Sequence, residues 1–241
     1  MLVLDAHVHC GTTLPFEKVE KSWHEGLIDG GVLISPVEEI YDRYNRSFTD
    51  SPYYQASRRE VHRYLESIKK ENIYRLWFVW NDFELPRPGF AGVKWHRHAY
   101  EPVYDYASPA CERFLQYVYE QRLPILLEEE FRNTLDFVRR VDQRTVIIIP
   151  HMGGLNGGYW SLKRAGIFDL PTVYVDTALA TPDEILDFAC VYGTDRIMFG
   201  SDFPFGDPAW ERAKVERIFS GADLEKVLSG NAVRLFGTQE K

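Results

Sequence analysis

The chain has 241 residues, 45% of them hydrophobic and 15% aromatic, which is enough to bury the core of one large α/β domain or two small ones. Its formal net charge of −8 argues against nucleic acid or an anionic membrane as the main partner. No apolar stretch approaches the length of a membrane span.

The cysteines and the first residues indicate the cellular compartment. Cys10, Cys111 and Cys190 are far apart in the sequence and form no CxxC pair, so a disulfide framework is not expected. Asp5 and His7 interrupt the first apolar run before a signal sequence could form. We therefore expect a cytoplasmic protein.

The first expected strand contains Asp5-Ala6-His7-Val8-His9. Because side chains in a strand alternate between its two faces, Asp5, His7 and His9 are expected on one face. Two neutral imidazoles on a buried strand can converge on one divalent metal ion. The alternative is a pair of structural histidines at a strand end.

Short apolar segments recur along the chain and alternate with longer amphipathic ones, which indicates a parallel sheet covered by helices. The expected strands are 2–9, 31–35, 74–80, 91–96, 124–129, 145–151, 172–177 and 196–201. The expected helices are 60–70, 109–121, 132–141, 155–165, 182–191, 209–219 and 224–235, and Ser108 and Thr181 stand at two of their starts as expected N-caps.

Eight strand–helix repeats in 241 residues fit the size of a (β/α)8 barrel. We predict an α/β fold of one domain, residues 1–241, formed by a single TIM barrel with its site at the C-terminal ends of the strands. An open doubly wound sheet is the alternative, but no glycine-rich phosphate loop follows the first strand.

The connection 37–72 is long and rich in tyrosine and phenylalanine. It is expected to lie over the barrel mouth or at a subunit contact, with an ordinary ordered surface excursion as the alternative. His24 and His62 are expected on the solvated surface.

Polar residues gather where the expected strands end, which is where the reactive sites of such barrels lie. Titratable groups stand on six neighbouring strands, an arrangement that stability alone does not explain. They include His7, His9, Lys94, His96, Glu128, His151, Asp176 and Asp202.

The sequence resembles the amidohydrolase superfamily, in the amidohydrolase-related branch that includes the aminocarboxymuconate-semialdehyde and resorcylate decarboxylases. The resemblance follows essentially the whole chain in order. Its motifs are DAHVH at 5–9, GVKWH at 92–96, LPILL at 123–127, IPHMGG at 149–154, VYVDT at 173–177, RIMFGSDFP at 196–204 and NAVRLF at 231–236.

The resemblance implies one divalent metal, zinc in the first place, held by His7, His9 and Asp202. Asp202 matches an aspartate that often also accepts a proton from water on the metal. His151 matches a histidine that acts there as an acid, a base or an electrostatic group. This agrees with general chemistry, because a divalent ion makes water acidic near neutral pH and histidine titrates in the useful range.

Glu128 departs from the family pattern, which has a metal-binding histidine at this position. Glu128 either replaces the histidine as an oxygen ligand, which would suit manganese or iron as well as zinc, or marks a site with weak or no metal binding. A third alternative turns Glu128 outward and Glu129 into the lumen, because a one-residue shift reverses the two faces of a strand.

Lys94, Trp95, His96 and Arg97 are predicted to bind the substrate, with the cations holding a carboxylate and Trp95 suiting an aromatic ring. The alternative for Lys94 is a structural ion pair with Glu128.

Two classes of function remain open. One is an enzyme that hydrolyses a small, anionic, carboxylated molecule, or alternatively decarboxylates an aromatic or unsaturated acid. The other is a barrel without metal that only binds a ligand. Similar barrels are commonly dimeric, so a homodimer is one expectation for the assembly.

Overall fold

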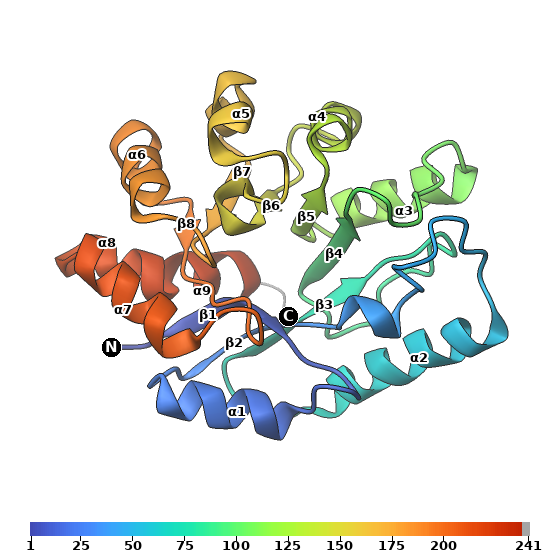
Figure 1. The fold of residues 1–241 in the computed structure, drawn as a ribbon, viewed down its shortest axis with the longest axis horizontal. Coiled ribbons are helices and arrows are strands. Elements are labelled where there is room, and N and C mark those ends of the chain that lie inside the picture. The colour runs from blue at the N-terminus through green and yellow to red at the C-terminus, as the bar shows by residue number, and fades with distance from the viewer. Residues whose placement is uncertain (238–241) are drawn as a thin grey trace.

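The computed structural model describes residues 1–237, in which eight parallel strands form one sheet in chain order (Figure 1). They are β1 (Leu4–His9), β2 (Gly30–Ile34), β3 (Ile73–Phe78), β4 (Gly92–Arg97), β5 (Ile125–Glu129), β6 (Ile147–Ile149), β7 (Val173–Asp176) and β8 (Ile197–Met198). Each overlaps an expected strand.

The last strand lies against the first and closes the barrel. The backbone N–H of Ala6 donates to the carbonyl of Phe199 at 2.8 Å, and that of Asp202 donates to the carbonyl of His7 at 2.7 Å. The predicted TIM barrel is therefore confirmed, and the seam between β8 and β1 joins the segments that carry His7, His9 and Asp202.

Helices surround the barrel on its outside (Figure 1). Within residues 1–237 they are α1 (Phe16–Glu25), α2 (Pro52–Ser67), α3 (Pro109–Glu120), α4 (Phe131–Arg140), α5 (Tyr159–Arg164), α6 (Pro182–Tyr192), α7 (Pro208–Ile218), α8 (Gly221–Glu225) and α9 (Asn231–Phe236). Ser108 caps α3, and Thr181 forms a capping box with Glu184 at α6, as the sequence predicts. None of these helices has the length and apolarity needed to cross a membrane.

Several helices differ from the prediction. The expected last helix 224–235 is divided into α8, a π-helical segment (Lys226–Gly230) and α9, and the expected helix 155–165 is shortened to α5. Helix α1 was not expected, although Phe16, Val19 and Trp23 recur at helical spacing and are buried. Helix α2 begins at Pro52, eight residues before the expected start at 60. Ser51 caps it, and Tyr53 and Tyr54 of the long connection lie in its first turn.

The packing of α2 on β3 corrects the assignment of His62 to the surface. His62 lies on the inner face of α2, is 2% exposed, and stacks on Trp77 of β3 with ring centroids 3.7 Å apart. Burial lowers its pKa to about 3, so the ring is neutral at physiological pH.

Residues 37–51 lie between β2 and α2 and reach across to the end of β4. The Tyr41 hydroxyl lies 3.2 Å from Nδ1 of His96, and the Arg43 guanidinium pairs with Glu101 at 2.6 Å. This part of the long connection therefore borders the C-terminal ends of the strands, where a site in a TIM barrel is expected.

A register shift in β1 between Asp5 and Val8 changes the alternation of side chains. The Asp5 carboxylate accepts hydrogen bonds from the Trp23 indole at 3.1 Å and from the Ser201 hydroxyl at 2.5 Å. Asp5 therefore does not join His7 and His9 as a third ligand on one face, which corrects the expectation from simple alternation.

Candidate functional site

The barrel seam brings together two histidines and an aspartate. His9 Nε2 lies 3.1 Å from Oδ1 of Asp202, and His7 Nε2 lies 3.4 Å from the same oxygen. All three residues are buried, and one nitrogen or oxygen from each lies within 4.8 Å of the others. Imidazole nitrogens and a carboxylate oxygen at this spacing are suited to a divalent cation.

Asp176 at the end of β7 orients His7. Its Oδ2 accepts a hydrogen bond from Nδ1 of His7 at 3.0 Å, so the Nδ1 atom carries the proton and Nε2 presents its lone pair. Nε2 is buried and has no hydrogen-bond partner among residues 1–237. A carboxylate behind the imidazole and a free nitrogen in front are typical of a metal-ligating histidine.

The His151 ring lies beside the His7 ring, with the two ring centroids 4.8 Å apart. Its backbone has φ 56° and its amide N–H donates to Asp176 Oδ1 at 2.9 Å, so the turn after β6 aims the ring inward. Nδ1 of His151 donates to the carbonyl of Ala178 at 3.2 Å. Nε2 lies 3.9 Å from both Asp202 Oδ2 and Glu128 Oε2.

Asp202 is held in a left-handed backbone conformation, with φ 57°. Burial disfavours its charged form, but the nearby rings of His7 and His9 outweigh this effect and lower its pKa to about 2. Asp202 therefore remains a carboxylate at neutral pH and can accept hydrogen bonds.

Glu128 faces the lumen at the end of β5, but it is already surrounded by nitrogen atoms. Its Oε2 accepts from the Lys94 ammonium at 2.5 Å, and its Oε1 lies 2.5 Å from His98 Nε2 and 3.2 Å from His96 Nε2. Burial opposes ionisation, yet Lys94 and the histidines hold the pKa of Glu128 well below its usual range. Lys94 thus forms the structural ion pair with Glu128 that the sequence analysis gives as the alternative to a role in substrate binding.

Trp95 and Arg97 lie on the opposite face of β4 from Lys94 and His96. Trp95 packs between the sheet and the helices, 4.9 Å from the Phe137 ring of α4. Arg97 pairs with Glu129 at 3.8 Å and with Glu130 at 3.2 Å. The structure therefore gives no support to a substrate-binding role for Trp95 or Arg97, because strand alternation turns both away from the lumen.

The Glu129 side chain also points outward, which settles which of the two glutamates faces the lumen. It accepts from the Tyr106 hydroxyl at 2.7 Å and from Asn133 of α4 at 3.1 Å. Burial raises the pKa of Glu129 to about 7. The alternative that placed Glu129 in the lumen is wrong.

Sequence reasoning missed three residues that shape the site. Tyr41 and Arg43 come from the long connection after β2, and Glu101 follows β4; their contacts with His96 and His98 arise only in the folded chain. One signal was available, because His96-Arg97-His98 repeats the His-x-His spacing of His7 and His9.

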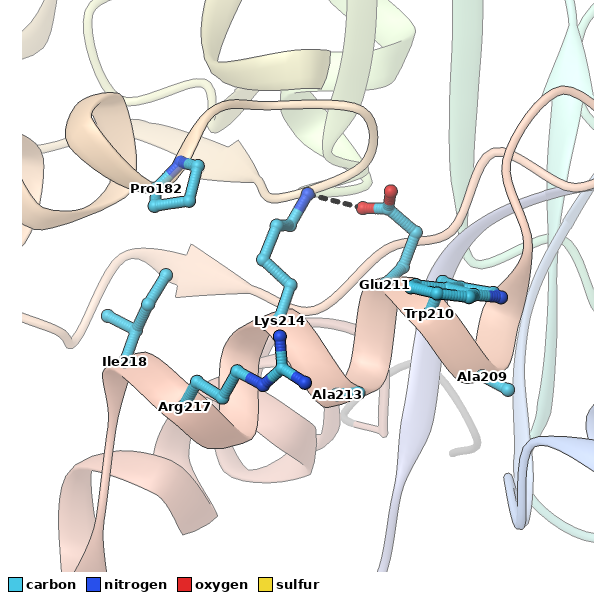
Figure 2. A pocket seen from close by; sticks show the side chains of 8 residues that line it. All are labelled: Pro182, Ala209, Trp210, Glu211, Ala213, Lys214, Arg217 and Ile218. Atoms are coloured by element: carbon cyan, nitrogen blue, oxygen red, sulfur yellow. Dashed lines mark hydrogen bonds and ion pairs between the residues drawn. The ribbon is translucent and has the colours of Figure 1, made fainter.

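A cavity of about 180 Å³ borders the seam, lined by His9, Arg43, Phe205 and residues of the loops after β1 and β2. A larger cavity of about 710 Å³ lies elsewhere, between the start of α6 and helix α7 (Figure 2). There Lys214 pairs with Glu211, and none of the lining residues is a predicted site residue. The smaller cavity is therefore the one that adjoins the candidate site.

Comparison with known proteins identifies the family. The model of the amidohydrolase family called Amidohydro_2 matches residues 83–238, which is more than half of the chain. The chain belongs to this amidohydrolase family. A search of curated proteins found no match.

Several solved structures share the fold over nearly the whole chain. A protein assigned as a 2-pyrone-4,6-dicarboxylic acid hydrolase from Pseudomonas putida has a TM-score of 0.70 at 17% identity and covers 100% of this chain and 98% of its own. The 2,6-dihydroxybenzoate decarboxylase from Rhizobium has a TM-score of 0.73 at 16% identity, covering 98% of each chain. A zinc-bound amidohydrolase from Burkholderia multivorans has a TM-score of 0.66 at 14% identity, covering 98% of this chain and 99% of its own.

Proposed function

We propose that the chain is a metal-dependent enzyme that hydrolyses a small carboxylated molecule. One observation carries this proposal: the convergence of His7, His9 and Asp202, with the buried His7 Nε2 left without a hydrogen-bond partner among residues 1–237. Membership of the amidohydrolase family agrees with it.

The residues present fit a divalent cation. His7, His9 and Asp202 would hold it, with Glu128 as a further oxygen donor. Among the described residues, the site has four buried carboxylates but only two fixed positive charges, those of Lys94 and Arg43. The carboxylates are Asp176, Asp202, Glu101 and Glu128, of which Glu128 pairs with Lys94 and Glu101 with Arg43. This excess of negative charge favours binding of a dication. When bound, such an ion polarises a substrate carbonyl and makes water acidic, and both zinc and manganese suit this mixture of ligands.

His151 and Asp202 would move the proton. Because Nδ1 of His151 donates to a carbonyl, Nε2 of the neutral ring carries the lone pair and faces Asp202. A water molecule held between these two bases would lose one proton to Asp202 as it attacks the substrate carbonyl, and the same proton would pass through His151 Nε2 to the leaving group. Arg43 lines the adjoining cavity and suits the carboxylate of an anionic substrate.

Decarboxylation is the second candidate, since the decarboxylase from Rhizobium has this fold. The same His151 Nε2 would then deliver a proton to the carbon that loses carbon dioxide. Hydrolysis consumes water and frees a new acid or alcohol, whereas decarboxylation releases carbon dioxide, so product analysis separates the two.

Metal analysis of the purified protein, with and without added zinc or manganese, tests the proposal. We expect bound metal in the wild type and its loss in His7→Ala, with His24→Ala as a matched control because His24 is exposed. In a substrate screen, His151→Ala should lower kcat by about 10²–10⁴-fold at unchanged metal content. Sub-stoichiometric metal after both treatments would instead favour a barrel that only binds a ligand.

A further inference from the structure

Helix α7 carries apolar side chains on two of its faces. Pro208 and Val215, two turns apart, are buried on its inner side. Trp210, Ala213 and Ile218 follow the spacing i, i+3 and i+8, which places them together on the outer side of the helix. A helix at the surface of a globular protein normally has one apolar stripe, so the outer stripe of α7 requires an explanation of its own.

The outer stripe of α7 lines the cavity of about 710 Å³, and Pro182 at the start of α6 faces it from the other side (Figure 2). Trp210 is 75% exposed. Other exposed apolar side chains extend this surface: Leu186 lies one turn beyond Pro182 on α6, and Leu179 and Phe205 lie in the loops that precede α6 and α7. These residues and the outer stripe make up the α6–α7 face. A continuous apolar surface on a folded chain marks a place where another molecule binds.

The charges of the α6–α7 face are balanced, although the chain has a net charge of −8. In the cavity, Lys214 pairs with Glu211 at 2.5 Å, and Arg217 adds one further positive charge. Asp183, exposed beside Pro182, adds one negative charge. Among residues 1–237, neither Arg217 nor Asp183 forms an ion pair. One cation and one anion of the face are therefore available to a partner.

A second copy of this chain supplies the matching charges. In a dimer with two-fold symmetry the same surface of both copies meets, so Arg217 of one copy can face Asp183 of the other, and the second pair forms by the same symmetry. Elsewhere the excess of negative charge makes two copies repel each other, whereas the balanced α6–α7 face allows contact.

We propose that the α6–α7 face is the interface of a two-fold homodimer, in which the outer stripe of each α7 fills the cavity of the other copy. Each Trp210 then leaves water, and burying an aromatic side chain removes about 150–250 Å² of surface. Tryptophan at the centre of an interface commonly carries a large share of the binding energy. The interface depends neither on a metal ion nor on the reaction catalysed.

Sedimentation equilibrium of the purified protein over a range of concentrations tests the interface. We expect a dimer in the wild type and a dissociation constant at least about 30-fold higher in Trp210→Ala. Trp160→Ala is the matched control, because Trp160 is 48% exposed but lies on α5, and it should leave the dimer unchanged. A thermal melt of both variants checks that they fold.

Exchange of the two charges tests the symmetry. Asp183→Arg and Arg217→Asp should each weaken the dimer, because like charges then meet, and the double variant should restore it, because the two ion pairs form again in the opposite sense. Asp136→Arg, an exposed change of the same charge on α4, should have no effect.

A wild type that stays monomeric at every concentration overturns the proposal, and so does a dimer that Trp210→Ala leaves intact. A double variant that associates no more tightly than either single one overturns the two-fold pairing of Arg217 with Asp183.

Discussion

Replacing Asp176 with asparagine tests whether this carboxylate prepares His7 for metal. Asp176 Oδ1 accepts the backbone N–H groups of His151 and Ala178, at 2.9 and 3.1 Å, so the amide oxygen of the new side chain should stay there. Its NH2 group would then replace Oδ2 and face His7 Nδ1. Two donors cannot pair, so the imidazole proton should move to Nε2 and block the lone pair that binds metal.

We expect Asp176→Asn to weaken zinc binding by about 10–100-fold, which is about 1.4–2.8 kcal/mol. Competition with a fluorescent zinc chelator gives the dissociation constant. Asp187→Asn is the matched control, because Asp187 of α6 pairs with Lys163 at 2.5 Å, remote from the predicted site residues. Equal zinc affinity of wild type and Asp176→Asn, or equal losses in the two variants, would refute the argument.

Four further results are expected. Glu128→Gln should lower the free energy of unfolding, measured in urea, by about 3–5 kcal/mol, because the fully buried Lys94 ammonium loses its charged partner. The double variant Lys94→Met, Glu128→Leu should recover much of this loss. The free energy of unfolding should fall by up to about 1.4 kcal/mol per pH unit as the pH drops from about 6.5 towards 3, because His62 takes up a proton in the unfolded chain before it does so in the folded one. In urea unfolding measured across this pH range, His62→Leu should flatten the dependence. An unchanged slope would contradict the burial of a neutral His62. Zinc at 100 times its dissociation constant should stabilise the protein by about 2.7 kcal/mol, seen as a higher Tm that His7→Ala abolishes. Trp95→Phe should lower Tm without changing zinc affinity, because Trp95 packs on the outer face of β4 against Phe137. Weakened zinc binding in this variant would contradict that position.

The sequence predicted the strands well because their apolar runs are continuous and the polar residues stop them at one end. His7, His9, His151 and Asp202 were identified by the same signal, since the carboxyl ends of parallel strands share one rim. Alternation along β4 was also available and would have separated Lys94 and His96 from Trp95 and Arg97.

Other features depend on tertiary structure and could not be predicted from periodicity. The register shift in β1 redirects Asp5 away from His7, and a single sequence gives no sign of such a bulge. His62 becomes buried because the inner face of α2 packs on β3, where its ring stacks on Trp77. The pairing of Glu101 with Arg43 joins residues 58 positions apart, which no local pattern reveals.

The shortness of β8 gives the seam of the barrel an additional role. β8 spans only Ile197–Met198, so the segment that carries Asp202 is joined to β1 by a few backbone hydrogen bonds and by the Asp5–Ser201 contacts. An ion held by His7, His9 and Asp202 would link β1 to the segment after β8 across this junction. Closing the barrel and binding metal would then be one coupled equilibrium, and amide hydrogen exchange at 199–206 should slow when metal is added.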